Sequence, residues 1–307
     1  MKRFTPMTRR TFTGTLAALA GVTVLPPLLR AASRPTPSPS LSAVDTHAHI
    51  FHRGLPAIGT ARYVPDYDAP VADYLKQLDA HGISHGVLVQ PSFLGTDNSY
   101  LVAALRQHPA RLRGVVVVEP TIAASALREF AAAGVAGVRL NLIGQEIPAF
   151  AAGPWPDFLQ RLKSVDFFVE VQREARDLPR IVGPLLAAGL QVVVDHFGRP
   201  DPARGIDDPG FRYLLQQAAS RRLWLKLSAS YRNGTGDTGA KIAAAAAPLA
   251  RAAFGPERLL WGSDWPHTQF EKVATYAAAR AQLDHWIPDP GERTAILQAS
   301  PAALFRI

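Results

Sequence analysis

The sequence contains no cysteine among its 307 residues. Disulfide bonds, thiolate nucleophiles and cysteine-ligated metal sites all need that side chain, so each of them is excluded. Charged residues are also sparse at 19%, whereas 48% of the residues are hydrophobic. This composition is typical of a globular protein with enough apolar mass for a large core.

Acidic residues are absent from residues 1–34, which contain six lysines and arginines. Removing those six charges from the formal net charge of +8 leaves about +2 for the rest of the chain. The high isoelectric point therefore depends largely on the N-terminal segment. We expect no nucleic-acid partner, because the remaining chain has no strongly basic balance.

The N-terminal segment has the pattern of an export signal. Arg9 and Arg10 form a twin-arginine pair, an uncharged segment follows over residues 11–29, and small residues come next. We expect residues 1–33 to be a Tat signal peptide, recognised by the Tat export machinery, and residues 34–40 to be a Pro/Ser linker. The mature protein would then be periplasmic or secreted. A retained N-terminal membrane anchor is the alternative.

Beyond the linker, short β-rich runs alternate with longer helical stretches. Eight runs are predicted to be strands, at 43–47, 86–90, 113–119, 137–140, 167–171, 191–195, 223–227 and 259–262. Helices are predicted between them at 71–81, 98–108, 123–133, 155–163, 178–188, 208–220, 241–254 and 270–284, with a last one at 292–299. Continuous apolar strands are typical of parallel sheets covered by helices.

Eight such units in residues 41–307 predict the α/β class, as a single-domain (β/α)₈ TIM barrel. A doubly wound open sheet is the alternative, but no Gly-x-Gly-x-x-Gly follows the first strand.

Polar side chains stand where these strands end, which is where a barrel of this kind carries its active site. The first strand ends in His47-Ala-His49, and a period of two places both imidazoles on one face. Two such side chains can hold a divalent metal or bind an oxyanion. The other strand ends contribute Gln90, Glu119, Arg139, Asn141, Glu170, Gln172, Asp195, His196, Arg199, Lys226, Ser228, Tyr231, Arg232, Asp264 and His267. So many polar strand ends indicate a functional site, since each is costly to bury without a partner.

Four motifs, at residues 44–49, 137–141, 195–200 and 262–267, resemble the amidohydrolase superfamily. Within amidohydrolase-related family 2 they are most similar to the lactone hydrolases, a branch that includes pyrone dicarboxylate and sugar lactonases. The most specific motifs are Asp-His-x-Gly-Arg-Pro and Gly-Ser-Asp-Trp-Pro. The resemblance runs in order from about Leu41 to the C-terminus.

The resemblance implies roles for matching residues. Asp264 would take a proton from the attacking water, while His47, His49 and His196 would stabilise the oxyanion. Arg139, Arg199 and Arg232, with His267, would bind the substrate. A single divalent metal, with zinc favoured, would be held by His47, His49 and Asp264, and a metal-independent site is the alternative.

The sequence also departs from its relatives. The segment 142–146 has no arginine where the pyrone dicarboxylate enzymes have one, which argues against a dicarboxylate substrate. The fifth strand carries Glu170 and Gln172 in place of a metal-binding histidine, and no lysine ends the fourth strand. We predict a hydrolase acting on a small anionic or polyhydroxy lactone. A metal-dependent decarboxylase and a non-catalytic periplasmic binding protein are the alternatives.

Overall fold

The computed structural model describes residues 40–307, so the expected signal peptide and nearly all of the linker lie outside the described part. Eight parallel strands follow one another in sequence order around a barrel. Their bounds are β1 Val44–Ala48, β2 His85–Val89, β3 Leu112–Val116, β4 Val135–Asn141, β5 Phe168–Gln172, β6 Val192–Val194, β7 Leu223–Ser228 and β8 Leu259–Gly262. No helix among residues 40–307 is both long and apolar enough to cross a membrane.

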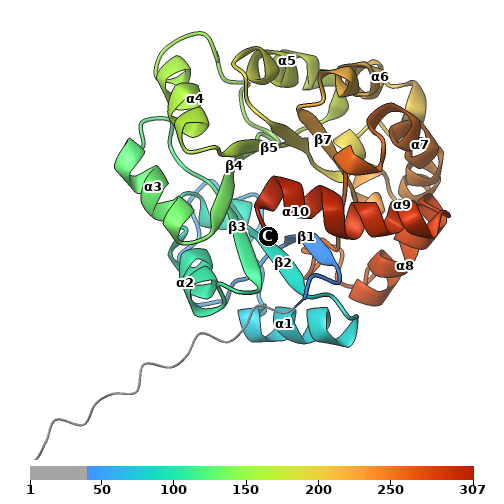
Figure 1. Ribbon diagram of the computed structural model, residues 1–307, viewed down its shortest axis with the longest axis horizontal. Helices are drawn as coiled ribbons and strands as arrows, with labels where there is room; N and C mark the ends of the chain where they lie inside the picture. Colours follow the sequence, from blue (N-terminus) through green and yellow to red (C-terminus); the bar gives the residue numbers. More distant parts are fainter. Residues whose placement is uncertain (1–39) are drawn as a thin grey trace, which may run out of the picture. The chain divides into compact units, whose positions relative to one another are not determined.

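Helices surround the strands (Figure 1). They are α1 Val71–Ala80, α2 Ser99–Gln107, α3 Ala124–Ala132, α4 Trp155–Ser164, α5 Pro179–Ala187, α6 Pro209–Gln217, α7 Thr238–Phe254, α8 Tyr276–Trp286, α9 Pro290–Thr294 and α10 Ser300–Phe305. The predicted (β/α)₈ barrel is thereby confirmed. The helices cover the outer face of the sheet, which explains why the strands are apolar on both faces.

The barrel closes where β8 meets β1. The backbone N–H of Asp264 donates to the carbonyl of His47 over 2.8 Å, and that of His49 donates to the carbonyl of Trp265 over 2.7 Å. A Cβ on Gly262 would lie 2.5 Å from the Cβ of His47. Only glycine therefore permits this close approach, which brings the ends of the first and last strands together.

The interior of the barrel is layered. Its lower layer is apolar and includes Phe168, Val193, Trp224 and Leu260. Two residues further along β5, β6 and β7 stand Glu170, Asp195 and Lys226, all fully or almost fully buried. Since side chains alternate along a strand, these charged groups form the next layer.

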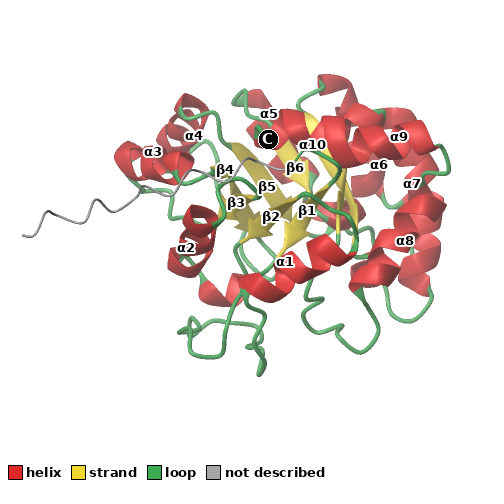
Figure 2. Cartoon of the chain, turned by 60° about the horizontal axis from the view of Figure 1, so that its bottom comes forward, coloured by secondary structure: helices red, strands yellow, loops and turns green. Residues whose placement is uncertain are grey.

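Helix α10 covers the N-terminal end of the barrel. Its residues Leu304 and Phe305 pack against the lower layer, and the ring of Phe305 lies 5.3 Å from that of Phe168. In Figure 2, long loops project from the lower side of the strands, whereas α10 lies toward the upper side. The opposite, carboxyl end of the strands is therefore the end at which loops can form a site.

The structure corrects three element bounds. The predicted helix at 270–284 begins only at Tyr276, where the Thr275 hydroxyl caps it by accepting from the Ala278 N–H. The predicted last helix at 292–299 is part of a longer helical run from Pro290 to Phe305, whose middle is a π-helical segment. Strand β3 ends at Val116 because the side-chain amide of Asn98 pairs with the backbone of Val117.

Candidate active site

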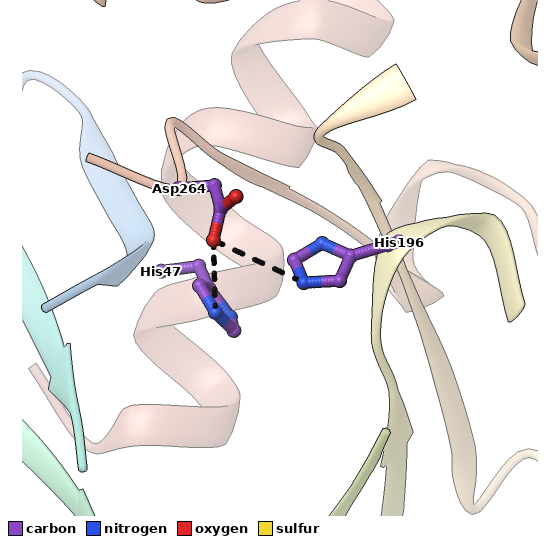
Figure 3. A group of neighbouring side chains, drawn as sticks. All are labelled: His47, His196 and Asp264. Carbon is purple, nitrogen blue, oxygen red and sulfur yellow. Dashed lines mark ion pairs between the residues drawn. The ribbon is translucent and has the colours of Figure 1, made fainter. Parts of the chain in front are cut away.

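Four predicted residues meet at the carboxyl end of the strands, and Figure 3 shows three of them, His47, His196 and Asp264. His47 lies in β1, His49 just beyond it, His196 after β6 and Asp264 after β8. The Oδ1 atom of Asp264 lies 3.6, 3.5 and 4.0 Å from the Nε2 atoms of His47, His49 and His196, respectively. Residues far apart in the sequence therefore place one carboxylate oxygen within 4.0 Å of three imidazole nitrogens.

The backbone around these residues is unusual. His196, Phe197, Arg199 and Asp264 have φ angles of 50°, 57°, 51° and 60°, in the left-handed region that non-glycine residues rarely adopt. Such conformations cost free energy and persist only where the surroundings fix them. The strain is concentrated at the strand ends that aim His196 and Asp264 at each other.

Asp264 uses its two oxygens differently. Its Oδ2 accepts hydrogen bonds from the Nε–H of Arg232 and from the hydroxyl of Tyr231, both over 2.7 Å. Its Oδ1 has no hydrogen-bond partner among residues 40–307. Burial alone would raise the pKa of this carboxyl, but the charge of Arg232 outweighs burial and holds the pKa well below its usual value. Asp264 is therefore ionised at neutral pH, with one oxygen free to accept a proton.

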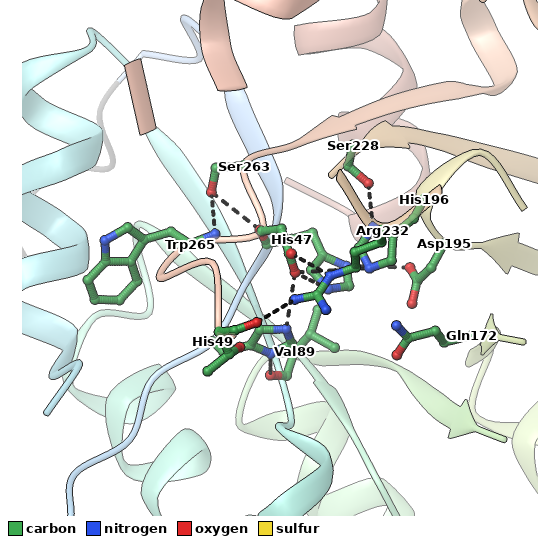
Figure 4. Close-up of polar contacts among 12 residues, drawn as sticks. His47, His49, Val89, Gln172, Asp195, His196, Ser228, Arg232, Ser263 and Trp265 are labelled. Carbon is green, nitrogen blue, oxygen red and sulfur yellow. Dashed lines mark hydrogen bonds and ion pairs between the residues drawn. The ribbon is translucent and has the colours of Figure 1, made fainter. Parts of the chain in front are cut away.

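The histidines are neutral. Burial lowers the pKa of His47 and of His49, and it lowers that of His196 to about 3. The Nδ1 of His49 lies 2.7 Å from the carbonyl oxygen of Val89, which can only accept, so this nitrogen carries the proton. The Nε2 of His49 consequently turns a lone pair toward Asp264. Figure 4 shows the three imidazoles between Trp265 and the side chains of Asp195 and Gln172.

A buried charged layer supports His47 from below. The ammonium of Lys226 lies 2.9 Å from Nδ1 of His47, 2.5 Å from Glu170 and 3.3 Å from Asp195. Burial, together with the neighbouring carboxylate of Asp195, raises the pKa of Glu170 to about 7. For Asp195, burial is outweighed by the charges of Lys226 and Arg139, which hold its pKa well below its usual value.

This layer determines the proton position on His47. An ammonium group can only donate, so Nδ1 of His47 must accept from Lys226. In the neutral ring the proton then resides on Nε2, which faces the open Oδ1 of Asp264. His47 therefore presents an N–H donor at the place where His49 presents a lone pair.

A cavity of about 170 Å³ opens above this group. Its lining includes His49, Arg62, Tyr63, Ser92, Arg139, Asn141, Ile143, Gln172, His196, Arg199, Arg232, Asp264, Gln269 and Phe270. Four of these residues are arginines and only Asp264 is acidic. The cavity is therefore suited to a small anionic molecule.

The predicted substrate-binding residues differ in their positions. Arg139 lines the cavity but also donates to Asp195 and Gln172, over 3.0 and 2.6 Å. Arg199 lines it with no ion pair to any described residue, and its buried Nε has no partner within residues 40–307. His267 is not among the lining residues, and its Nδ1 lies 3.1 Å from the hydroxyl of Tyr231.

The structure adds residues that the strand pattern does not indicate. Arg62 and Tyr63 reach the cavity from the long segment between β1 and α1, which has neither helical nor strand periodicity. Tyr67 in the same segment donates to Glu271 over 2.6 Å and so ties it to the segment after β8. Gln172 and Tyr231 were visible as polar strand ends, but their contacts could not be read from the sequence.

Several side chains of this group could hold a metal. The donor atoms of His47, His196 and Asp264 lie within 4.8 Å of one another, and those of His196 and Asp264 have no partner among the described residues. His49 turns a lone pair to the same carboxylate. This set fits a divalent cation once the Nε2 of His47 has lost its proton.

Comparison with known proteins gives the following matches. The sequence model of the amidohydrolase family matches residues 44–307. The 2-pyrone-4,6-dicarboxylate hydrolase of Comamonas testosteroni is 32% identical over 73% of this chain and 77% of its own length. The 4-sulfomuconolactone hydrolase of Hydrogenophaga intermedia is 28% identical over 85% of this chain and 88% of its own.

A solved structure is also similar. It is that of a probable 2-pyrone-4,6-dicarboxylic acid hydrolase from Acinetobacter baumannii with citric acid bound. The two chains are 39% identical, with a TM-score of 0.84 over 87% of this chain and all of the other.

Proposed function

The chain belongs to the amidohydrolase family, and on that basis we propose that it is a lactonase, a hydrolase that opens a small anionic lactone. The observation that carries this proposal is the free Oδ1 of Asp264, which lies within 4.0 Å of three imidazole nitrogens beneath a cavity lined by four arginines. Relatives named for pyrone dicarboxylate and sulfomuconolactone hydrolysis support an anionic lactone, as does the citric acid bound to a similar structure.

The chain's own residues provide the proton transfers. Asp264 Oδ1 accepts a proton from water as the water oxygen forms a bond to the lactone carbonyl carbon. The carbonyl electron pair moves onto its oxygen, which the Nε2–H of His47 stabilises by a hydrogen bond. As that pair returns, the ring C–O bond breaks and Asp264 gives its proton to the leaving oxygen. The products are one carboxyl group and one hydroxyl or enol group.

Arg232 links substrate binding to the base. It donates to Asp264 Oδ2 and also lines the cavity, so its guanidinium can be shared between the carboxylate and an anionic substrate. Sharing weakens its effect on Asp264, whose pKa then rises and which becomes a stronger base. Binding and proton abstraction are thereby coupled through one side chain.

A divalent cation at this site would be held by Asp264, His49 and His196, joined by His47 after loss of its Nε2 proton. Such an ion would supply Lewis-acid polarisation of the carbonyl and a lower pKa for bound water. Elemental analysis of the purified full chain, before and after exhaustive chelation, decides between a metal-bound and a metal-free site.

We propose further that residues 1–33 direct the protein through the Tat pathway to the periplasm or beyond. The support is the twin-arginine pair with the uncharged segment that follows it.

Hydrolysis of a lactone panel by the purified protein tests the proposed reaction. The panel contains pyrone carboxylates, muconolactones and neutral sugar lactones. We expect turnover of anionic members in preference to neutral ones. Release of carbon dioxide without ring opening would instead identify the decarboxylase, and binding without turnover would identify the non-catalytic binding protein.

A further inference from the structure

The charges in and below the cavity do not balance. Taken in their ionised forms, the cations of this set are Arg62, Arg139, Arg199, Arg232 and Lys226. Within residues 40–307, only three carboxylates form ion pairs with these cations: Glu170, Asp195 and Asp264. Two positive charges are therefore left without a counterpart, and uncompensated charge in a partly enclosed cavity favours ligands of the opposite sign.

The surplus can be assigned to particular side chains. Arg139 pairs with Asp195 over 3.0 Å, and Arg232 pairs with Asp264 over 2.7 Å. Arg62 and Arg199 line the same cavity, yet neither has a carboxylate within 4.0 Å in the described part of the chain. Glu174 is the acid whose charge acts on both, but it lies more than 4.0 Å from either guanidinium; it is 3.4 Å from Arg173, which pairs more closely with Asp177, over 2.6 Å.

Arg62 reaches the end of β4 from a different part of the chain. Its Nη2–H donates to Oδ1 of Asn141, the last residue of β4, over 3.4 Å. The residue is exposed at the rim, but its guanidinium lines the cavity, where burial and the charges of Arg139 and Arg232 lower its pKa. The segment 142–146 that follows β4 has no arginine. Arg62 thus supplies a positive charge beside the end of β4, where the segment that follows β4 has no arginine of its own.

We propose that Arg62 is a specificity-determining residue that binds a second anionic group of the substrate, while Arg199 binds the first. The inference rests on the proposed lactone hydrolysis for the identity of the substrate. It narrows the substrate class to lactones with two anionic substituents, and it reverses the expectation against a dicarboxylate that the segment 142–146 suggested. The forked guanidinium of Arg62 matches a carboxylate or sulfonate at the cavity rim.

Binding of non-hydrolysable aromatic acids tests this without any turnover. Isophthalate carries two carboxylates and benzoate one on the same ring, and calorimetric titration of the full chain with each measures the preference. We expect Arg62→Gln to weaken isophthalate binding by about tenfold or more and benzoate binding by less than about twofold. Arg62→Lys should restore part of the preference, since it keeps the charge but loses the fork.

Arg53→Gln is the matched control. Arg53 lies in the same segment between β1 and α1, but it is exposed and pairs with Asp68 away from the cavity lining. The control removes the same charge and should leave the isophthalate preference intact.

Three results would overturn the inference: a wild-type protein without preference for isophthalate, an Arg62→Gln protein that keeps it, or equal losses for both acids. Hydrolysis of lactones combined with any of these results rejects the role of Arg62 alone. An Arg62-dependent preference in a protein that opens no lactone rejects the proposed reaction instead.

Discussion

The ammonium nitrogen of Lys226 lies 2.9 Å from Nδ1 of His47, and both side chains are completely buried. The two residues are 179 positions apart, on β7 and β1. Through this contact, a residue below the cavity determines which nitrogen of the His47 imidazole carries the proton. The charged layer inside the barrel is therefore part of the site and not only of the core.

Loss of Lys226 should destabilise the fold strongly. Lys226→Met leaves Glu170 buried without its closest cation and leaves Asp195 with Arg139 alone. Breaking such a buried cluster costs about 3–5 kcal/mol. Urea denaturation measures the change in the free energy of unfolding. Lys76→Met is the control, because Lys76 pairs with Asp73 at the exposed surface, where an ion pair contributes about 0–1 kcal/mol. Equal losses in the two variants would show that the buried layer is not held by charge.

Asp264→Asn should remove the proton acceptor while keeping the shape of the side chain. We expect kcat to fall by at least ~10²-fold, the usual scale for a general base. Steady-state kinetics on the best lactone of the panel measures the fall, and circular dichroism checks the fold. Asp68→Asn, on an exposed carboxylate at the surface, should turn over normally. An Asp264→Asn protein that is folded and works at the parental rate would remove the mechanism proposed here.

Arg232→Met should move the acid limb of activity to higher pH. The active form of Asp264 is ionised, so kcat/KM falls when the pH drops through its pKa. Arg232 is the strongest influence that lowers this pKa against the effect of burial, so its loss lets the pKa rise. The ratio of kcat/KM at pH 5.5 to kcat/KM at pH 8 should therefore be lower in the variant than in the wild type.

The matched control for that shift is Arg199→Met. Arg199 lines the same cavity but does not hydrogen-bond Asp264, and the two charges act on each other only weakly, so its loss should raise KM and change the ratio between the two pH values much less than the loss of Arg232. An unchanged ratio in Arg232→Met would mean that Arg232 does not control the ionisation of Asp264.

Replacement of Arg9 and Arg10 by lysine should keep the protein in the cytoplasm, because the export receptor reads the arginine pair and not the charge alone. Cell fractionation and immunoblotting measure the distribution. Arg3→Lys makes the same chemical change outside the pair and should be exported. Normal export of the double variant would contradict the Tat assignment.

The sequence predicts the strands and the central residues for the same physical reason. Parallel strands buried on both faces are continuous apolar runs, and their carboxyl ends meet at one edge, so His47, His196 and Asp264 could be expected together. Phe168, Glu170 and Gln172 are every second residue of β5, so the sequence also indicated an apolar layer followed by polar ones inside the barrel. It did not indicate which residues of other strands these side chains contact.

Other features depend on tertiary structure that no local pattern encodes. Arg62 lies in a segment without periodicity, so its approach to Asn141 requires the folded path of that segment. The sequence also could not show which arginines are neutralised, because Arg139 and Arg232 pair with carboxylates that follow other strands. The start of α8 was misplaced because residues 270–275 have a helical composition, whereas the Thr275 cap fixes the boundary.

Helix α10 has a consequence for the order of events in turnover. It covers the amino end of the barrel, where Phe305 packs on Phe168, so substrate must arrive and product must depart through the loop-lined mouth. Ring opening adds a carboxylate, and the product therefore leaves with one more negative charge than the substrate brought. A cavity with surplus arginines holds such a molecule more tightly than its precursor. We expect product departure to limit the rate, the product to compete with fresh substrate, and moderate salt to accelerate turnover by screening that attraction.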